Sequence, residues 1–265
     1  MINYFKDKVV WITGASSGIG EALVKELNKH QAKLVISARR VEELERVKAG
    51  CVPNDNILIV PVDMEQQHKM NEQVDVVIKQ FGRIDLLINN AGISQRALAV
   101  DTQLDIDKKI MEVNYFGAVA LTKAILPHMI KQQSGHIGVI SSVTGKIGVP
   151  MRSAYAASKH ALFGFFDALR AENAKFNIFV TMICPGYIRT NISLNALLGD
   201  GKPQRSMDKT TDAGMTPEEL AAKIVKALAR RKNEVYFGGK EVLGIYLRRF
   251  VPNLFFSIIK KARPV

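Results

Sequence analysis

Short apolar runs alternate along the chain with longer stretches of mixed polarity. The runs are almost continuously apolar, which is typical of strands that are buried on both faces of a sheet. They occupy residues 9–13, 34–38, 57–62, 86–89, 137–141, 178–183 and 235–237. The stretches between them are long enough for crossover helices. The pattern therefore predicts an α/β fold, a doubly wound sheet of about seven parallel strands with helices on both faces.

One segment interrupts this rhythm. Residues 192–215 are polar and rich in Gly, Asp and Lys, and loops of this length in compact domains are commonly functional. Directly after them Thr216 is a predicted N-cap, Pro217 the first helical residue and Glu219 the capping-box partner, so we expect a helix down to about residue 231. We interpret the chain as one catalytic domain over residues 1–240, with a flexible lid at about 192–215, and an extension over 241–265.

Positive charge is concentrated at the C-terminal end. The chain has 265 residues, of which 47% are apolar, and a net charge of +12. Residues 230–265 contain nine basic and two acidic residues and so carry +7 of this charge. Because the excess lies in the tail, and no nucleic-acid motif is present, we expect no nucleic-acid partner.

The cysteines and histidines do not form a ligand pattern. Cys51 and Cys184 have no CxxC neighbour, and the five histidines lack the spacing of zinc ligands. We therefore expect no metal and a reducing compartment. The N-terminal residues enter an apolar strand without a signal-like or membrane-spanning run, which predicts a cytoplasmic protein.

A glycine-rich turn follows the first predicted strand. Gly14, Gly18 and Gly20 have G-xxx-G-x-G spacing at the point where the strand gives way to a helix. Glycines here let the backbone approach a pyrophosphate, and the helix N-terminus offers free N–H groups. Glycines at such a turn can also be purely structural, but the context favours a Rossmann-type dinucleotide loop. The other residues expected to contact the cofactor from this loop are Ser16, Ser17 and Ile19.

The end of the second predicted strand bears on the choice of nucleotide. A carboxylate about 20 residues past the glycines would bind the ribose 2′-hydroxyl of NAD, but Ala38 stands there and is followed by Arg39 and Arg40. A guanidinium can bind a 2′-phosphate, which a carboxylate would repel. The plainer interpretation is two solvated arginines at the start of a helix. We predict NADP(H) as the cofactor.

Further motifs follow in the order of one known family. After the glycine loop the chain carries Asp63, Asn89-Asn90-Ala91-Gly92, Asn114, Ser142, Tyr155, Lys159 and Pro185-Gly186. Most of these are weak signals alone, since a Tyr and a Lys four residues apart on a helix are usually a surface pair. Together they resemble the short-chain dehydrogenase/reductase family over about residues 6–240.

The residue types suit the reduction of a carbonyl. This reaction needs a hydride from a nicotinamide and a proton for the developing alkoxide. Lys159 lies one helical turn from Tyr155, and its ammonium favours the phenolate, so it would lower the tyrosine pKa from about 10. Ser142 ends the fifth predicted strand, where its hydroxyl can donate to the substrate oxygen. Ser141 is the alternative, because neighbouring side chains on a strand face opposite sides.

The resemblance implies the remaining roles. Tyr155 is the general acid and base, Lys159 also binds the nicotinamide ribose, and Asn114 holds a water of the proton relay. The resemblance further implies cofactor contacts from Asp63, Asn89, Ala91, Gly92, Pro185, Gly186, Ile188 and Thr190.

The extension alternates apolar clusters with the basic pairs 248–249 and 260–261, and it resembles the tails of steroid and retinoid reductases. Its longest uncharged run, residues 250–259, has ten residues, whereas a membrane span needs about 20. Two interpretations stay open. The tail lies on an anionic membrane surface, or it packs on its own domain or at a subunit contact.

These observations predict an NADP(H)-dependent oxidoreductase that interconverts a carbonyl and an alcohol on an apolar substrate, in either direction. The expected substrate pocket contains residues 192–215 together with Ile93, Ser94, Thr144 and Tyr187. The alternatives are a 3-ketoacyl-thioester reductase, which the long tail disfavours, and a non-catalytic NADP-binding redox sensor, which would typically lack the Tyr or the Lys. The resemblance and the apolar helices around 103–131 and 153–175 predict a homodimer or homotetramer.

Overall fold

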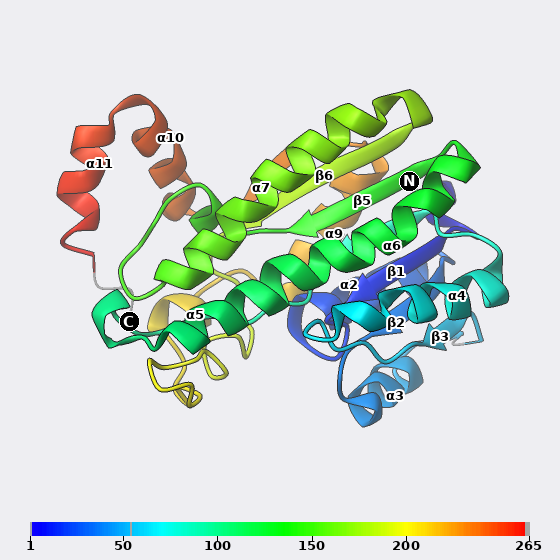
Figure 1. Ribbon diagram of the computed structural model, residues 1–265, viewed down its shortest axis with the longest axis horizontal. Coiled ribbons are helices and arrows are strands. Elements are labelled where there is room, and N and C mark those ends of the chain that lie inside the picture. The colour runs from blue at the N-terminus through cyan, green and yellow to red at the C-terminus, as the bar shows by residue number, and fades with distance from the viewer. Residues whose placement is uncertain (1, 54, 263–265) are drawn as a thin grey trace.

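The fold is a single parallel sheet covered by helices on both faces (Figure 1). The computed structural model describes residues 2–53 and 55–262. The sheet has seven strands in the order β3-β2-β1-β4-β5-β6-β7, which confirms the predicted doubly wound sheet. Their bounds are β1 Val9–Thr13, β2 Lys33–Ser37, β3 Ile57–Ile59, β4 Leu86–Asn89, β5 Gly135–Ile140, β6 Ile178–Pro185 and β7 Glu234–Phe237.

Alternate side chains of each strand enter two separate cores. In β1, Val9 and Trp11 pack under the helices α4, α6 and α7, whereas Val10 and Ile12 pack under α2, α3 and α9. Because both faces are covered, every residue of β1 is buried, and this is why its sequence shows no polar alternation. The bounds of the covering helices are α2 Gly18–Lys29, α3 Val41–Ala49, α4 Met70–Phe81, α6 Gly117–Gln132, α7 Ser153–Asn173 and α9 Pro217–Ala229.

Shorter helices complete the chain. A π-helical turn over Glu112–Phe116 joins α5 to α6. Before α9, the predicted capping box is confirmed, because Glu219 N donates to Thr216 Oγ1 and Thr216 N donates to Glu219 Oε2. The remaining α-helices are α1 Ile2–Phe5, α5 Leu104–Met111, α8 Lys209–Asp212, α10 Leu243–Phe250 and α11 Pro252–Ile259.

Strand β1 lies at the point where the winding of the sheet reverses. It pairs with β2 on one side and with β4 on the other, in parallel register. The chain therefore leaves β1 and β4 in opposite directions, which opens a crevice beyond their carboxyl ends. Ligands of open α/β sheets bind at such a point, so the topology alone places the candidate site there.

Segment 192–215 is folded against the domain. It contains α8 and is tied down by the β-bridges Gln95–Leu197 and Ile188–Met215. Ser193 and Ala196 are fully buried. The mobility that the sequence predicts for this segment stays a prediction.

The extension forms two helices, α10 and α11, which stand out beyond one end of α7 (Figure 1). Ile245 and Phe255 are buried against Val143 and Ile147 of the domain. The extension thus packs on its own domain through one face only, and residues 263–265 of the predicted tail lie outside the described residues. Within residues 2–53 and 55–262, no helix combines the length and the apolar character that a membrane span requires.

Candidate active site

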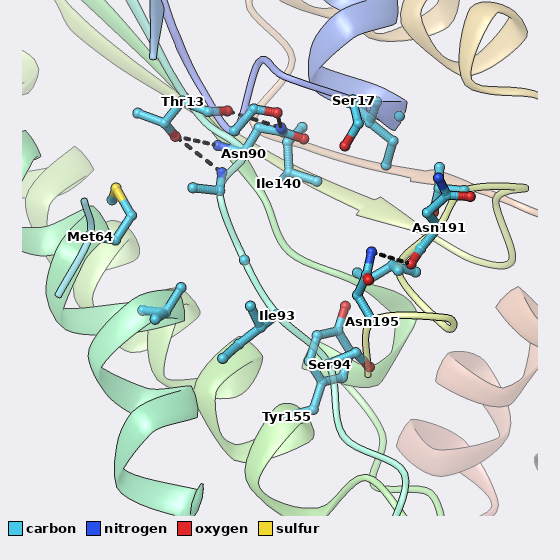
Figure 2. A pocket seen from close by; sticks show the side chains of 18 of the residues that line it. Thr13, Ser17, Met64, Asn90, Ile93, Ser94, Ile140, Tyr155, Asn191 and Asn195 are labelled. Atoms are coloured by element: carbon cyan, nitrogen blue, oxygen red, sulfur yellow. Dashed lines mark hydrogen bonds between the residues drawn. The ribbon is translucent and has the colours of Figure 1, made fainter. Parts of the chain in front are cut away.

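A cavity of about 540 Å³ opens at the carboxyl ends of the central strands. Figure 2 shows side chains of β1, of the stretch that follows β4, and of β5, α7 and segment 192–215 around it. One end is lined by the glycine loop and Arg39, and the other by Tyr155 and residues of segment 192–215. The cavity thus joins the predicted nucleotide site to the predicted catalytic residues.

The glycine loop is shaped for close approach of a phosphate. Gly14 and Gly18 have φ values of +65° and +55°, which side chains rarely tolerate. A Cβ on Gly14 would lie 2.8 Å from Ala91 Cα, and one on Gly20 would lie 2.1 Å from Gly14 O. The side chain of Ser17 makes no capping bond to α2. The free N–H groups at this helix start and the bare backbone fit a dinucleotide pyrophosphate.

Strand β4 is bonded to this loop through Thr13 and Asn90. Thr13 Oγ1 accepts hydrogen bonds from Asn90 N at 3.0 Å and Ala91 N at 3.1 Å (Figure 2). In return, Asn90 Nδ2 donates to Thr13 O and Gly14 O. The side chain of Asn89 is buried and donates to Thr122 Oγ1, and it is not among the residues that line the cavity, so its predicted contact with the cofactor stays a prediction.

Basic and acidic side chains share the adenosine end of the cavity. Arg39 and Arg40 are exposed, and both line the cavity with Asp63, as predicted. Glu65, which the sequence analysis missed, lies 4.0 Å from Arg39 and 3.9 Å from Lys109. Asp63 accepts a hydrogen bond from Glu65 N. Arg39 therefore has an exposed, weakly paired guanidinium at this edge.

Tyr155, Lys159 and Ser142 meet at the other end. The two α7 residues are buried, and Lys159 Nζ lies 5.8 Å from the Tyr155 ring centroid. Lys159 Nζ donates to Ile140 O at 2.9 Å. Ser141 Oγ donates to Lys159 O, so it anchors α7 to β5. Ser142 is less buried than Ser141, and its Oγ accepts from Thr144 N. The serine predicted to be catalytic is thus the more accessible of the pair.

Burial and charge oppose each other at the tyrosine. Burial raises the pKa of Tyr155, while the positive charge of Arg152, a hydrogen bond with Ser142 and the charge of Arg96 lower it. Burial also lowers the pKa of Lys159 to about 8. The charges that favour the phenolate here belong to the two arginines, which the sequence analysis did not consider. The effect of Lys159 on the tyrosine stays a prediction.

Asn114 holds the backbone beyond β4. Its Oδ1 accepts from Ile93 N at 2.8 Å, and its Nδ2 donates to Ile93 O and Ser158 Oγ at 3.0 Å. A Cβ added to Gly92 would lie 3.1 Å from Asn114 Oδ1, so the glycine permits this packing. Asn114 lies behind the cavity wall, and the water predicted beside it stays a prediction.

The cavity wall also contains Pro185, Gly186, Ile188 and Thr190, and their contact with the nicotinamide stays a prediction. Tyr187 N donates to Glu241 Oε1 at 3.1 Å. Glu241 belongs to a short helical turn, Lys240–Val242, that precedes α10. The extension is therefore attached to the wall of the site by a carboxylate.

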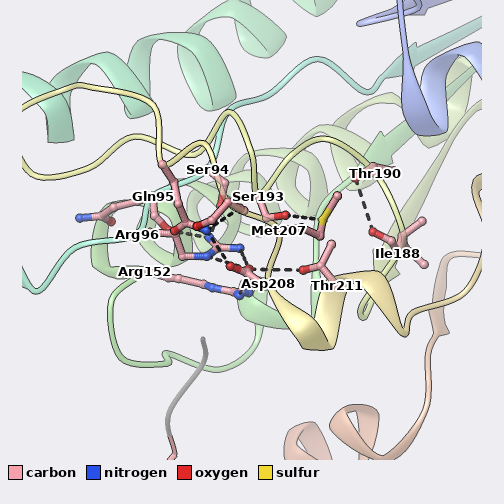
Figure 3. A network of polar contacts seen from close by, with 12 residues as sticks. Ser94, Gln95, Arg96, Arg152, Ile188, Thr190, Ser193, Met207, Asp208 and Thr211 are labelled. Atoms are coloured by element: carbon pink, nitrogen blue, oxygen red, sulfur yellow. Dashed lines mark hydrogen bonds and ion pairs between the residues drawn. The ribbon is translucent and has the colours of Figure 1, made fainter.

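The substrate end differs from the apolar pocket that the sequence suggests. Ile93, Ser94 and Tyr187 line the cavity, but Thr144 is buried outside it, which corrects that prediction. Arg96 and Arg152 also line it, and both lie against the carboxylate of Asp208 (Figure 3). The sequence analysis missed Arg152. The signal that could have found it is its position three residues before Tyr155, at the start of the same helix.

Comparison with known proteins agrees with the geometry. The family model described as short chain dehydrogenase matches residues 8–198. A Xenopus tropicalis protein named dehydrogenase/reductase SDR family member 7B is 44% identical, over 97% of this chain and 85% of that protein. The chain belongs to the short-chain dehydrogenase/reductase family.

Solved structures share the whole architecture of this short-chain dehydrogenase/reductase. A short-chain dehydrogenase from Streptomyces avermitilis is 28% identical, with a TM-score of 0.83 and 97% coverage of both chains. A second family structure, from Burkholderia phymatum in complex with NAD, is 22% identical, with a TM-score of 0.83 and coverage of 99% of this chain and 98% of that chain. The chain is thus an oxidoreductase of the short-chain dehydrogenase/reductase family.

Proposed function

We propose that the chain is an NADP(H)-dependent oxidoreductase that interconverts a carbonyl and an alcohol, with Tyr155 as general acid and base. The observation that carries the proposal is the convergence of Tyr155, Lys159 and Ser142 at one end of a cavity whose other end is the glycine loop. A nicotinamide nucleotide supplies the hydride when it is bound there. A large part of the substrate-end lining is apolar or uncharged, which supports a substrate with an apolar body.

The protein groups act on the carbonyl oxygen. Tyr155 donates its hydroxyl proton as negative charge develops on that oxygen, and Ser142 donates a hydrogen bond to it. Lys159 supplies positive charge behind the tyrosine and binds the nicotinamide ribose. In the reverse direction Tyr155 accepts the proton of the alcohol, so the same residues serve both directions.

Three features support NADP(H) over NAD(H). Ala38 places no carboxylate at the end of β2, and Arg39 projects there, weakly paired and largely exposed. Arg40 adds a second positive charge to the same wall. A 2′-phosphate can recruit these guanidiniums from their solvated positions.

A variant of Tyr155 tests the proposed reaction. Oxidation of NADPH is followed against a panel of ketones and aldehydes, and Tyr155→Phe is expected to lower kcat by about 10²- to 10⁴-fold, the usual contribution of general acid catalysis. Tyr246→Phe, on the exposed face of α10, is the matched control and should keep full activity. Equal activity of the wild type and Tyr155→Phe would refute the proposed role.

Two exposed apolar surfaces extend the proposal. Leu104 and Phe116 remain exposed on α5 and the π-helical turn, beside α7, which supports a homodimer or homotetramer that pairs these helices. Sedimentation as a 29.4 kDa monomer at micromolar concentration would contradict it.

The outer face of α10 and α11 exposes Phe250 and Phe256 near basic residues, which supports peripheral contact with an anionic membrane.

A further inference from the structure

The substrate end of the cavity holds more positive than negative charge. Of the charged residues that line the cavity, Asp63 and Glu65 lie near Arg39 at the adenosine end. The charged lining residues around the catalytic tyrosine are Arg96, Arg152 and Lys159. Each of these side chains is more than nine-tenths buried. Buried charges of one sign need a partner, because solvent does not screen them.

One carboxylate serves both arginines, and Arg96 uses most of it. Arg96 Nε donates to Asp208 Oδ2 at 2.9 Å, and its Nη2 donates to the same oxygen. Arg96 Nη1 donates to Ser94 Oγ and Gln95 O. The guanidinium of Arg96 is therefore satisfied by the protein. The carboxylate of Asp208 also accepts hydrogen bonds from Gln204 Nε2 and Thr211 Oγ1, so it can accept few further hydrogen bonds from Arg152.

Arg152 is left with one long contact. Its Nη2 lies 3.4 Å from Asp208 Oδ2, and its Nε, although buried, has no hydrogen-bond partner among the described residues. The side chain is 9% exposed and lines the cavity. Figure 3 shows the Arg152 side chain alongside the Arg96–Asp208 pair. A buried guanidinium that the protein leaves incompletely paired is suited to bind a planar or tetrahedral anion through its N–H groups.

The position of Arg152 fixes where that anion lies relative to the reaction. Arg152 is the N-cap of α7 and precedes Tyr155 by three residues. Both side chains line the same cavity, and the charge of Arg152 is close enough to lower the pKa of Tyr155, against the effect of burial. An anion on Arg152 is thus separated by only a few bonds from a carbonyl carbon whose oxygen is at Tyr155. The N-terminal end of the 21-residue α7 adds its positive dipole at the same place.

We propose that the substrate carries an anionic group, a carboxylate or a phosphate, within a few bonds of the reacting carbonyl, and that Arg152 binds it. The inference rests on the oxidoreductase function proposed above and narrows its substrate class. The apolar lining then accommodates the remainder of a substrate that has one charged end. Arg96 is a positioning residue that holds Asp208 and leaves the Arg152 donors directed to the substrate.

Matched substrate pairs test this inference. The kcat/KM for 5-oxohexanoate is compared with that for its methyl ester, and that for 4-oxopentyl phosphate with that for 5-hydroxypentan-2-one. The wild type is expected to prefer an anion by at least about 10-fold, and the preferred pair identifies carboxylate or phosphate. Arg152→Gln should reduce that preference by about 10- to 100-fold, mainly by losing activity on the anion. As a control, Arg205→Gln removes an exposed charge from segment 192–215, and it should change neither the preference for the anion nor the activity on it.

Other outcomes separate the inference from the function on which it rests. Ketone reduction that depends on Tyr155 but shows no preference for either anion overturns the inference and leaves the function standing. If Arg152→Gln lowers kcat/KM equally for anionic and neutral ketones, the inference is also overturned, because Arg152 would then act through Tyr155 and not on the substrate anion. A second experiment serves if Arg152→Gln fails to fold. The reduction of a neutral ketone by the wild type is measured with hexanoate, pentyl phosphate or hexanamide added as inhibitor. We expect one of the two anions to inhibit competitively and the neutral amide not to inhibit. If none of the three inhibits, or if the amide inhibits as strongly as the anions, the inference is overturned.

Discussion

Arg96 and Asp208 are 112 residues apart in the chain, yet their side chains form an ion pair that is 2% and 0% exposed. Arg96 follows β4 at the cavity, and Asp208 lies in segment 192–215. Burial raises the pKa of Asp208, but the hydrogen bonds from Arg96 and Gln204 hold it below its ordinary value. The pair therefore stays ionised and joins segment 192–215 to the substrate end of the site at Asp208.

Removing one partner of this pair should destabilise the protein. Asp208→Asn leaves Arg96 and Arg152 buried without a counter-charge, and such losses cost about 3–5 kcal/mol. Urea unfolding of the variant and the wild type measures the difference in free energy of unfolding. Asp200→Asn, in the same segment but exposed to solvent, is the matched control and should stay within about 0.5 kcal/mol of the wild type. Equal destabilisation by the two variants would contradict this account.

The lid predicted from sequence has a direct measurement. We expect amides of 192–215 to exchange with solvent faster than those of β5, and to slow when NADPH and a substrate analogue are added, because such segments close on binding. Hydrogen exchange with and without the ligands tests this. Strong uniform protection of 192–215 in the free protein would show that the segment is a fixed wall.

Cofactor preference should depend on Arg39. Arg39→Ala is expected to weaken NADPH binding by about 10- to 100-fold, since a charge-assisted hydrogen bond contributes about 1.5–3 kcal/mol, and to leave NADH nearly unchanged. Ala38→Asp should lower NADPH affinity further and improve that of NADH. Titration of both cofactors measures each effect, with Arg230→Ala, at an exposed arginine beyond α9, as control. Equal affinities of the wild type for the two cofactors would refute the assignment.

His136 predicts how stability changes with pH. Burial lowers its pKa to about 3, from 6.5, so the folded chain keeps the ring neutral while the unfolded chain binds a proton below about pH 6.5. Stability is therefore lost as pH falls through this range, by about 2 kcal/mol between pH 7 and pH 5. His136→Gln, which can still hydrogen-bond Thr181, should remove this part of the pH dependence. If the free energy of unfolding has the same slope against pH in the wild type and in His136→Gln, His136 does not contribute to the pH dependence of stability.

The exposed face of the C-terminal helices gives a membrane prediction. Full-length protein should sediment with vesicles containing phosphatidylserine at low salt, and Phe250→Glu with Phe256→Glu should abolish this without altering cofactor binding. Val100→Glu, at an exposed apolar residue outside the extension, is the control. A protein that ignores such vesicles would leave the second interpretation, packing on its own domain or at a subunit contact.

The sequence predicted the features that are determined by residues close together in the chain. The strands followed from continuous apolar runs because both faces of the sheet are covered, and the capping box of Thr216 followed from four neighbouring residues. The charged substrate end could not be predicted this way. Arg152 and Asp208 are 56 residues apart, and no local spacing reports that two arginines share one carboxylate. The direction of the Asn89 side chain could not be predicted either, because neighbouring side chains at a strand end point to opposite sides and only the tertiary fold determines which side is the cavity.

The placement of Arg152, Tyr155 and Lys159 at the start of one helix makes the site sensitive to chain length. Their relative positions come from a rotation of about 100° and a rise of about 1.5 Å per residue, and Ser141 fixes the helix to β5 at Lys159. A single inserted or deleted residue between Tyr155 and Lys159 would turn the tyrosine by about a quarter of a revolution, away from the cavity. Substitutions on the outer face of α7 leave these positions unchanged. The number of residues between Arg152 and Lys159 is therefore constrained more strictly than the identity of the residues on the outer face of this helix.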